Sequence, residues 1–261
     1  MTYGEYVAGI ESLYLRQWLR QWASIEESLP ARGPMMGELL PWTPKRVLIV
    51  APHPDDECLM AGAALRLMSE CSARVEVVPF SYGSNLLRQE ERSEELSRAV
   101  RELGFEVLDP REEGNRKDLQ EDELRGALER SHPDLVLCPH DEDAHPTHIR
   151  CSKLTQRAIR RHVNERQAPL ILLESEYWHP LRDPNLRVSL SVADVTRMGE
   201  GLLKHAGEVA RNPYHLSLPA WLMDQERRGV ERIHGLGSVP PARSVFSQIY
   251  RMTVVSPEVG S

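Results

Sequence analysis

The stretch Val47-Leu-Ile-Val-Ala-Pro-His-Pro-Asp-Asp-Glu57 decides the fold, because an apolar run passes directly into a histidine and three consecutive carboxylates. The apolar residues 47–51 predict a buried strand. In open α/β sheets, ligands bind beyond the carboxyl ends of the strands, where loops carry polar groups on a rigid platform. Residues 53–57 take that position, so we expect a binding site at the end of this strand.

Strand-like and helix-like hydrophobic periods alternate along the rest of the chain. Extended patterns cover 75–80, 106–108, 135–138, 170–173 and 187–192, and helical patterns cover 59–68, 89–103, 122–129, 146–164, 195–209 and 221–233. Strands that alternate with helices predict an α/β fold, with a mostly parallel sheet covered by helices on both faces.

Residues 1–45 precede this alternation. Apolar residues recur there at helical spacing, at Tyr6, Ile10, Leu13, Tyr14, Trp18, Trp22 and Ile25. The stretch from Pro30 to Pro44 has the composition of a connector. No repeat or change of composition divides the remainder. We therefore expect an N-terminal helical extension and linker over 1–45, packed on a single domain over 46–261.

The bulk composition narrows the class of partner. The 261 residues are 41% hydrophobic, which suffices for one substantial core, and carry a net charge of −7. That charge disfavours nucleic acid, because binding to phosphates needs clustered Lys and Arg. Neither a secretory leader nor a run of about 18 apolar residues occurs. We expect a cytoplasmic protein without a membrane span, four reduced cysteines and a small-molecule substrate.

The polar residues at two strand ends predict a divalent metal site. Adjacent carboxylates repel one another unless a cation or a proton offsets them. His53 and Asp56 form a reasonable half of a zinc site. The second half follows the apolar run 135–138, in His145-Pro-Thr-His148, where one histidine can bind metal while the other leans over the same pocket. One carboxylate among 141–143 is a candidate to orient a site histidine.

The two motifs together resemble the LmbE-like, or PIG-L, family of zinc-dependent de-N-acetylases. The hallmarks of that family are a (P/A)-H-P-D-D-E loop and a later H-P-x-H. The likeness runs from about Arg46 to Pro184 and includes an intervening Arg92-x-x-Glu95 helix and the segment Glu176-Tyr-Trp178. One departure is Met60-Ala-Gly-Ala63, where the family often has G-x-G-G.

The resemblance implies a Rossmann-like fold and a zinc ion held by His53, Asp56 and His148. It also implies that Asp55 is the general base and that His145 faces the developing oxyanion. Other divalent ions also accept such ligands. The expected substrate-binding residues are Arg92, Tyr177 and Trp178.

The expected activity is hydrolysis of the N-acetyl group of an amino sugar or glycoconjugate, with release of acetate. Zinc would activate water, Asp55 would take its proton, and a protonated His145 would stabilise the tetrahedral oxyanion. One alternative is the same chemistry on another acylated conjugate, such as a thiol conjugate or an antibiotic precursor. Another is a non-catalytic sugar-binding homologue, which has no need of a general base. A dinucleotide-binding enzyme is disfavoured, because no G-x-G-x-x-G follows the first strand.

Overall fold

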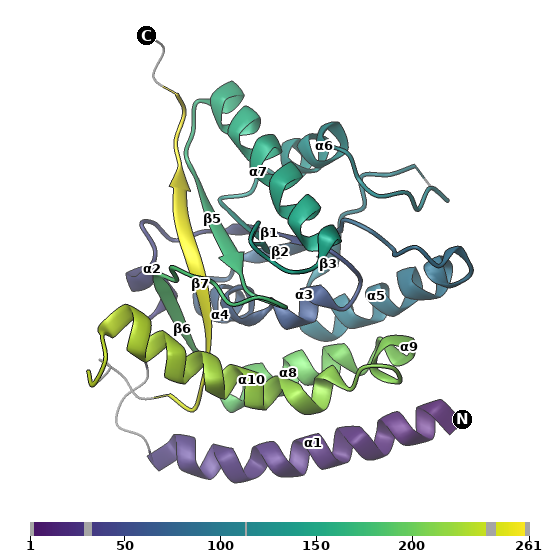
Figure 1. The fold of residues 1–261 in the computed structure, drawn as a ribbon, viewed down its shortest axis with the longest axis vertical. Coiled ribbons are helices and arrows are strands. Elements are labelled where there is room, and N and C mark those ends of the chain that lie inside the picture. The colour runs from purple at the N-terminus through teal and green to yellow at the C-terminus, as the bar shows by residue number, and fades with distance from the viewer. Residues whose placement is uncertain (1–2, 29–32, 113, 239–243, 259–261) are drawn as a thin grey trace.

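A seven-stranded sheet forms the centre of the protein in the computed structural model, which describes residues 3–28, 33–112, 114–238 and 244–258 (Figure 1). Its order is β3-β2-β1-β4-β5-β7-β6. The strands are β1 (Arg46–Ala51), β2 (Arg74–Pro79), β3 (Glu106–Val107), β4 (Leu135–Pro139), β5 (Leu170–Ser175), β6 (Leu186–Leu190) and β7 (Phe246–Val255). The five strands from β3 to β5 run parallel, and β7 runs antiparallel to both β5 and β6.

Helices cover both faces of this sheet. They are α1 (Tyr3–Ser28), α2 (Met36–Leu39), α3 (Asp56–Leu59), α4 (Gly62–Cys71), α5 (Gln89–Leu103), α6 (Glu121–Ser131), α7 (Pro146–Arg166), α8 (Val192–Leu202), α9 (Ala206–Val209) and α10 (Tyr214–Gly229), with short turns η1 (Leu86–Arg88) and η2 (Val230–His234). One hydrophobic core joins the sheet to α3, α4, α5, α8 and α10, and a second joins its other face to α6 and α7. The predicted α/β architecture with a mostly parallel sheet is confirmed. Within the described ranges, no helix has the length and apolar content needed to cross a bilayer.

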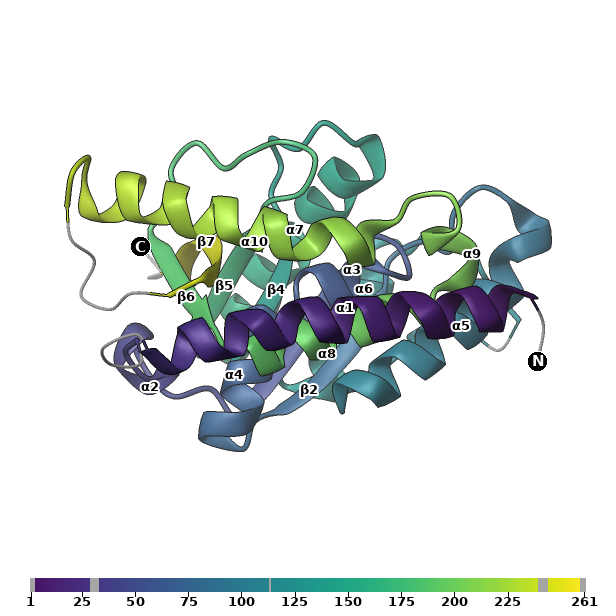
Figure 2. The same cartoon turned by 90° about the horizontal axis from the view of Figure 1, so that it is seen from below.

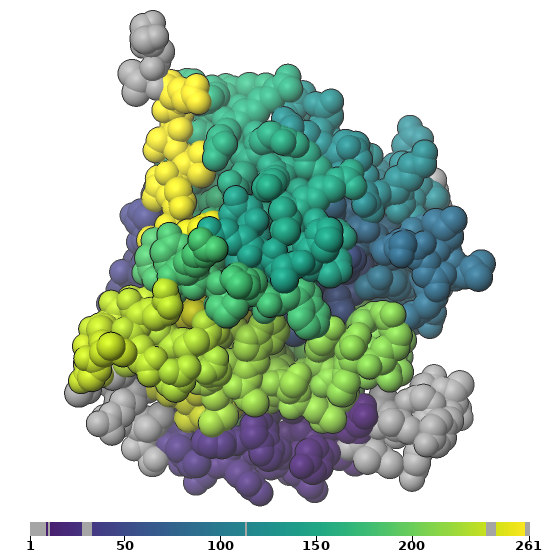
Figure 3. Space-filling view, in the orientation of Figure 1, coloured from purple at the N-terminus to yellow at the C-terminus, as the bar shows by residue number. Residues whose placement is uncertain are grey.

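The predicted N-terminal helix exists and lies across the outside of α8 (Figure 2). In the space-filling view it forms a band beside α10 along one edge of the molecule (Figure 3). Trp18 and Trp22 pack against the core as expected, whereas Leu13 and Tyr14 are exposed and Leu15 and Leu19 are buried in their place. The buried stripe is therefore rotated from the predicted one. The side chains of Tyr6 and Ile10 lie outside the described residues.

Several predicted helices have different bounds in the structure, and the one expected over 59–68 begins at Gly62 as α4. The helix expected over 195–209 is two helices, because the chain turns at 203–205 between α8 and α9. The helix expected over 221–233 begins earlier, at Tyr214, and holds Pro219 in its interior.

Strand β7 has no counterpart among the predicted elements. Ser247 and Gln248 are buried in it beside Phe246 and Tyr250, so its sequence lacks the alternation of apolar and polar residues that marks a half-buried strand. The polar pair is satisfied inside the protein, since Gln248 donates to the Leu59 carbonyl oxygen and Ser247 donates to Glu226.

Candidate metal centre and catalytic pocket

The acidic loop passes directly from strand β1 into helix α3. Asp56 is the first residue of α3, and Asp55 is its N-cap, with φ of 124°. The acidic run 55–57 is therefore not wholly a loop, because the helix starts between Asp55 and Asp56. A positive φ is uncommon and strained for a residue with a side chain. The Asp55 backbone N–H donates to the Glu57 Oε2 atom at 2.8 Å, which helps to hold this conformation.

The three expected ligands His53, Asp56 and His148 converge, with one donor atom of each within 4.8 Å of the others. The Asp56 Oδ2 atom lies 3.4 Å from His53 Nδ1 and 3.4 Å from His148 Nε2. Donor atoms bound at about 2.0–2.1 Å to one tetrahedral zinc ion lie roughly 3.3 Å apart. The spacing and chemistry of these donors therefore fit zinc.

Charge is concentrated at this centre. Burial opposes ionisation of Asp56, but His148 and His53 hold its pKa below the ordinary value. Burial also disfavours the protonated form of His148, yet Asp56 and Asp143 together raise its pKa to about 10. Asp56 thus attracts positive charge strongly, which is the property required of a metal ligand.

Two further side chains, Asp143 and Tyr177, contact the predicted ligands His148 and Asp56. Asp143 Oδ2 lies 3.5 Å from His148 Nδ1, the ring nitrogen on the side away from Asp56. This places a carboxylate behind a histidine that is a predicted metal ligand, as expected for the run 141–143. The Tyr177 hydroxyl donates to the Asp56 carbonyl oxygen at 2.8 Å, and its ring packs edge-on against His148. Tyr177 is buried and takes the position of a support for the loop, not that of a substrate contact.

Asp55 lines the pocket beside the three predicted ligands. It is only 6% exposed. Burial, followed by the adjacent charge of Asp56, raises the pKa of Asp55 well above 3.8, and Arg92 opposes this. A carboxylate with a raised pKa is a better proton acceptor than an exposed aspartate.

His145 caps the amino end of α7 and faces the same pocket. Its Nδ1 atom accepts a hydrogen bond from the Thr147 backbone N–H at 3.3 Å. The ring hydrogen of a neutral imidazole then lies on Nε2. Burial and the neighbouring His148 and His53 lower the pKa of His145. The lowered pKa favours the neutral ring, whose Nε2–H can donate into the pocket, and the expected protonated form stays a prediction.

A cavity of about 480 Å³ opens over these residues. Its other walls are formed by the loop 81–85, η1, α5, the loop after β5, α9 and the segment that leads from α9 into α10. They contribute Ser81, Tyr82, Ser84, Asn85, Arg88, Arg92, Trp178, Glu208, Arg211, Asn212 and Tyr214. Trp178 is 54% exposed at this cavity, where a substrate could meet it. Arg92 lines it too, although its guanidinium already donates to the carbonyl oxygens of Pro54 and Tyr82.

Arg88, Glu208 and Arg211 line the cavity although no motif in the sequence marks them. They lie far from both motifs along the chain, and only the fold brings them to the cavity.

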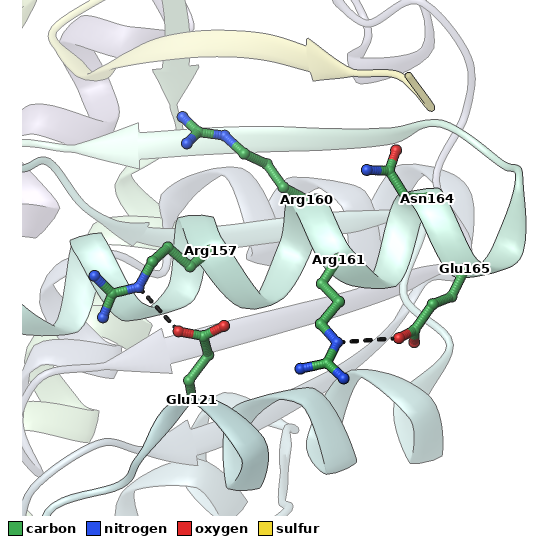
Figure 4. Close-up of a pocket in the computed structure, with 6 residues that line it drawn as sticks. All are labelled: Glu121, Arg157, Arg160, Arg161, Asn164 and Glu165. Atoms are coloured by element: carbon green, nitrogen blue, oxygen red, sulfur yellow. Dashed lines mark hydrogen bonds and ion pairs between the residues drawn. The ribbon is translucent and has the colours of Figure 1, made fainter. Parts of the chain in front are cut away.

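A different hollow, of about 530 Å³, lies between α6 and α7 (Figure 4). It holds surface ion pairs, Arg157 with Glu121 and Arg161 with Glu165, and no residue of either motif.

The departure at Met60-Ala-Gly-Ala63 keeps one glycine, Gly62. A Cβ atom on Gly62 would lie 2.5 Å from Gln248 Oε1 and 3.0 Å from a methyl carbon of Leu190. The Gly62 N–H donates to Gln248 Oε1, and the Ala63 N–H donates to the Tyr250 hydroxyl. Strand β7 thus packs closely against the turn between α3 and α4, and a side chain at position 62 would require Gln248 to move.

Comparison with known proteins places these residues in a family segment. Residues 48–159 match the family model described as PIG-L, GlcNAc-PI de-N-acetylase. The 1D-myo-inositol 2-acetamido-2-deoxy-alpha-D-glucopyranoside deacetylase of Corynebacterium urealyticum is 28% identical, over 48% of this chain and 51% of that protein. The chain therefore spans about half the length of the curated relative that it matches.

Solved structures share the fold at low identity. N,N'-diacetylchitobiose deacetylase from Pyrococcus horikoshii has a TM-score of 0.58 at 15% identity, covering 80% of this chain and 84% of that one. GalB, the 4-carboxy-2-hydroxymuconate hydratase from Pseudomonas putida KT2440, has a TM-score of 0.56 at 20% identity, covering 83% and 98%. Fold alone therefore does not separate a deacetylase from a hydratase. The resemblance to the PIG-L family is nevertheless confirmed through residues 48–159, which hold every predicted metal ligand and both predicted catalytic residues.

Proposed function

We propose that this chain is a metal-dependent amide hydrolase that removes the N-acetyl group from an amino sugar or glycoconjugate and releases acetate. The observation that carries the proposal is the spacing of the Asp56 carboxylate from His53 and His148, which suits zinc, with the Asp55 carboxylate beside it in an open cavity. A non-catalytic sugar-binding protein would not need a general base such as Asp55 beside the predicted metal site.

When bound, zinc would supply Lewis acidity, which lowers the pKa of water to about 7 and polarises an amide carbonyl. His53, Asp56 and His148 would hold it. Asp55 accepts the proton of the attacking water as the new carbon–oxygen bond forms. The Nε2–H of His145 donates to the oxygen that becomes negative. Asp55 then returns the proton to the leaving amine, the carbon–nitrogen bond breaks, and acetate and a free amino sugar result.

The cavity favours a hydroxyl-rich substrate. Its walls carry the hydroxyl and amide groups of Ser81, Ser84, Asn85 and Asn212, and Trp178 offers an exposed ring. The relative from Corynebacterium urealyticum is named for an acetamido sugar, which makes acetamidoglucose conjugates the first substrates to test. Other small acylated amides remain the second candidate class, since the same metal chemistry would cleave them.

Metal content and acetate release test the proposal together. We expect about one zinc per chain and chelator-sensitive release of acetate from a panel containing N-acetylglucosamine, its inositol conjugate and diacetylchitobiose. Asp55→Asn should lose about 1,000-fold in kcat and keep its zinc. Asp122→Asn, which alters an exposed carboxylate on α6, is the matched control. Zinc-loaded protein that cleaves no acetyl amide would exclude the deacetylase proposal, and cleavage of a non-sugar amide alone would shift it to the second class.

A further inference from the structure

A second cluster of ionisable side chains lies directly beneath the acidic loop. Glu57 and Cys58 of α3 meet His205, which comes from the turn between α8 and α9. All three are fully buried. The His205 Nε2 atom lies 2.6 Å from Glu57 Oε1, and the Cys58 thiol donates to the same oxygen at 3.3 Å. Because a carboxylate only accepts, the His205 Nε2 atom is the donor.

The distances indicate a hydrogen-bonded anchor and not a second metal site. Donor atoms on one zinc ion lie roughly 3.3 Å apart, and 2.6 Å is a direct hydrogen bond. Burial, with the charge of Glu57, also raises the pKa of the Cys58 thiol well above 9.0, which disfavours the thiolate that a metal requires.

The other oxygen of Glu57 connects this cluster to the proposed base. Glu57 Oε2 accepts the backbone N–H of Asp55 at 2.8 Å. Asp55 is the residue with the strained φ of 124°, which persists only where surrounding contacts enforce it. By contrast, Asp56 has contacts of its own, since His53 N–H donates to its carboxylate and Tyr177 donates to its carbonyl oxygen. The backbone conformation of Asp55 thus depends on Glu57, whereas Asp56 is held mainly by other contacts.

His205 also begins one wall of the cavity. Its carbonyl oxygen accepts the N–H groups of Glu208 and Val209 in the first turn of α9, and Glu208 lines the cavity. One residue therefore joins the acidic loop through its side chain to the cavity wall through its backbone. Helices α8 and α3 also pack closely beside this cluster, because a Cβ atom on Gly201 of α8 would lie 2.9 Å from Cys58 Sγ.

We propose that His205 is a positioning residue that holds the Glu57 carboxylate, and through it fixes the Asp55 backbone and the direction of the proposed base. The inference rests on the proposed function for its effect on rate, but the anchoring itself is a property of the fold. Removing the imidazole should move Asp55 while leaving the metal ligands in place. A shift of about 1 Å in a catalytic group costs on the order of 100-fold in rate.

The first experiment compares His205→Leu, His205→Gln and His162→Leu in the full chain loaded with zinc. His162 is a buried histidine of α7 outside both clusters, which makes it the matched control. We expect His205→Leu to lower kcat about 100-fold, with KM and zinc affinity changed less than about threefold. The Gln variant keeps a donor for Glu57 and should recover most of the loss. Full kcat in His205→Leu would overturn the proposal.

The double variant Glu57→Leu/His205→Leu separates positioning from stability. Replacing both buried partners with apolar side chains restores folding where the single change leaves an unpaired charge. The Asp55 N–H still lacks its acceptor, so kcat should stay low although the protein folds. A stable double variant with the kcat of the unmodified chain would mean that the pair serves folding only.

A readout independent of turnover is the rate at which a small thiol reagent modifies Cys58, followed by peptide mass spectrometry. The His205→Leu change should expose Cys58 faster and leave the buried Cys138 of β4 protected. Unchanged protection of Cys58 would show that His205 does not hold the loop. This readout also separates the two proposals, because an inactive unmodified chain would exclude the hydrolase while Cys58 still reports on the anchor.

Discussion

Asp143 Oδ2 lies 3.5 Å from Nδ1 of His148, while the other ring nitrogen of that histidine faces Asp56. The same carboxylate accepts the backbone N–H groups of His145 and Trp178. Asp143 therefore links the second motif to the loop after β5 and sets the ring orientation of a predicted metal ligand. Carboxylates in this position contribute to metal affinity although they never touch the ion.

Loss of this carboxylate should weaken metal binding. We expect Asp143→Ala to lower zinc affinity about 10- to 100-fold, because His148 loses its orienting partner. Competition with a chromogenic chelator measures the affinity. Asp141→Ala is the matched control, since Asp141 lies in the same loop and pairs with Arg251 instead. Equal zinc affinity in both variants would contradict the assigned role.

Zinc should stabilise the folded chain through His148. At free zinc about 1,000 times the dissociation constant, binding adds about 4 kcal/mol to the free energy of unfolding. Thermal unfolding with added zinc and with chelator measures the shift. We expect His148→Ala to abolish the zinc-dependent part of the shift, and His162→Ala to keep it at a lower starting Tm. A full zinc response in His148→Ala would remove this residue from the ligand set.

Trp178 should bind substrate without taking part in the chemistry. Its exposed ring stands edge-on to Tyr214 at 5.8 Å at the cavity. We expect Trp178→Ala to raise KM about tenfold with kcat unchanged, because a contact made equally in the ground state and transition state is lost. Trp178→Phe keeps an aromatic face, so its KM should lie between that of the unmodified chain and that of Trp178→Ala. Steady-state kinetics on the best acetamido sugar decides, and a loss confined to kcat would refute the assignment.

The attachment of α1 should depend on pH through Glu200. Burial opposes ionisation of Glu200, but hydrogen bonds from Arg16 and Ser12 hold its pKa below 4.5. A carboxyl with a depressed folded pKa contributes stability above pH 4.5 and loses it as the pH falls through the folded value. We expect Glu200→Gln to lower the free energy of unfolding by about 1.5 kcal/mol at pH 7.

That difference between Glu200→Gln and the unmodified chain should shrink as the pH falls below 4.5. Denaturant unfolding of both proteins from pH 7 to pH 3 measures it. Glu102→Gln, which alters a carboxylate paired with Lys204 at the surface, serves as the control and should show little change. A constant difference across the range would place the stabilising effect of Glu200 outside its charge.

The three predicted metal ligands could be picked out from the sequence because each belongs to a short motif at the end of an apolar run. His53 and Asp56 follow β1, and His148 follows β4, and neighbouring parallel strands bring their ends together. The ligand geometry therefore needed only the pairing of two strands. The family resemblance then indicated that His148, and not His145, is the metal ligand. The spacing of the two histidines alone did not decide between them.

The remaining parts of the site come from contacts distant in sequence. Glu57 and His205 are 148 positions apart, and nothing in the local pattern around His205 marks it as part of the site. The conformation of Asp55 was also missed, since a run of acidic residues does not reveal that a helix begins within it. Strand β7 was missed because its buried Ser247 and Gln248 have partners that exist only in the folded protein.

The position of β7 has a consequence for the order of events during synthesis. A chain leaves the ribosome from its amino end, so β7 emerges after the other strands of the sheet. Until then β5 and β6 lack the neighbour that lies between them, and Gly62 lacks Gln248. A nascent chain that already displays both metal-binding motifs is thus unable to complete its sheet. We therefore expect a ribosome-stalled chain that ends before residue 246 to retain zinc less tightly than residues 1–261 do, because the turn after α3 then lacks its contacts with β7.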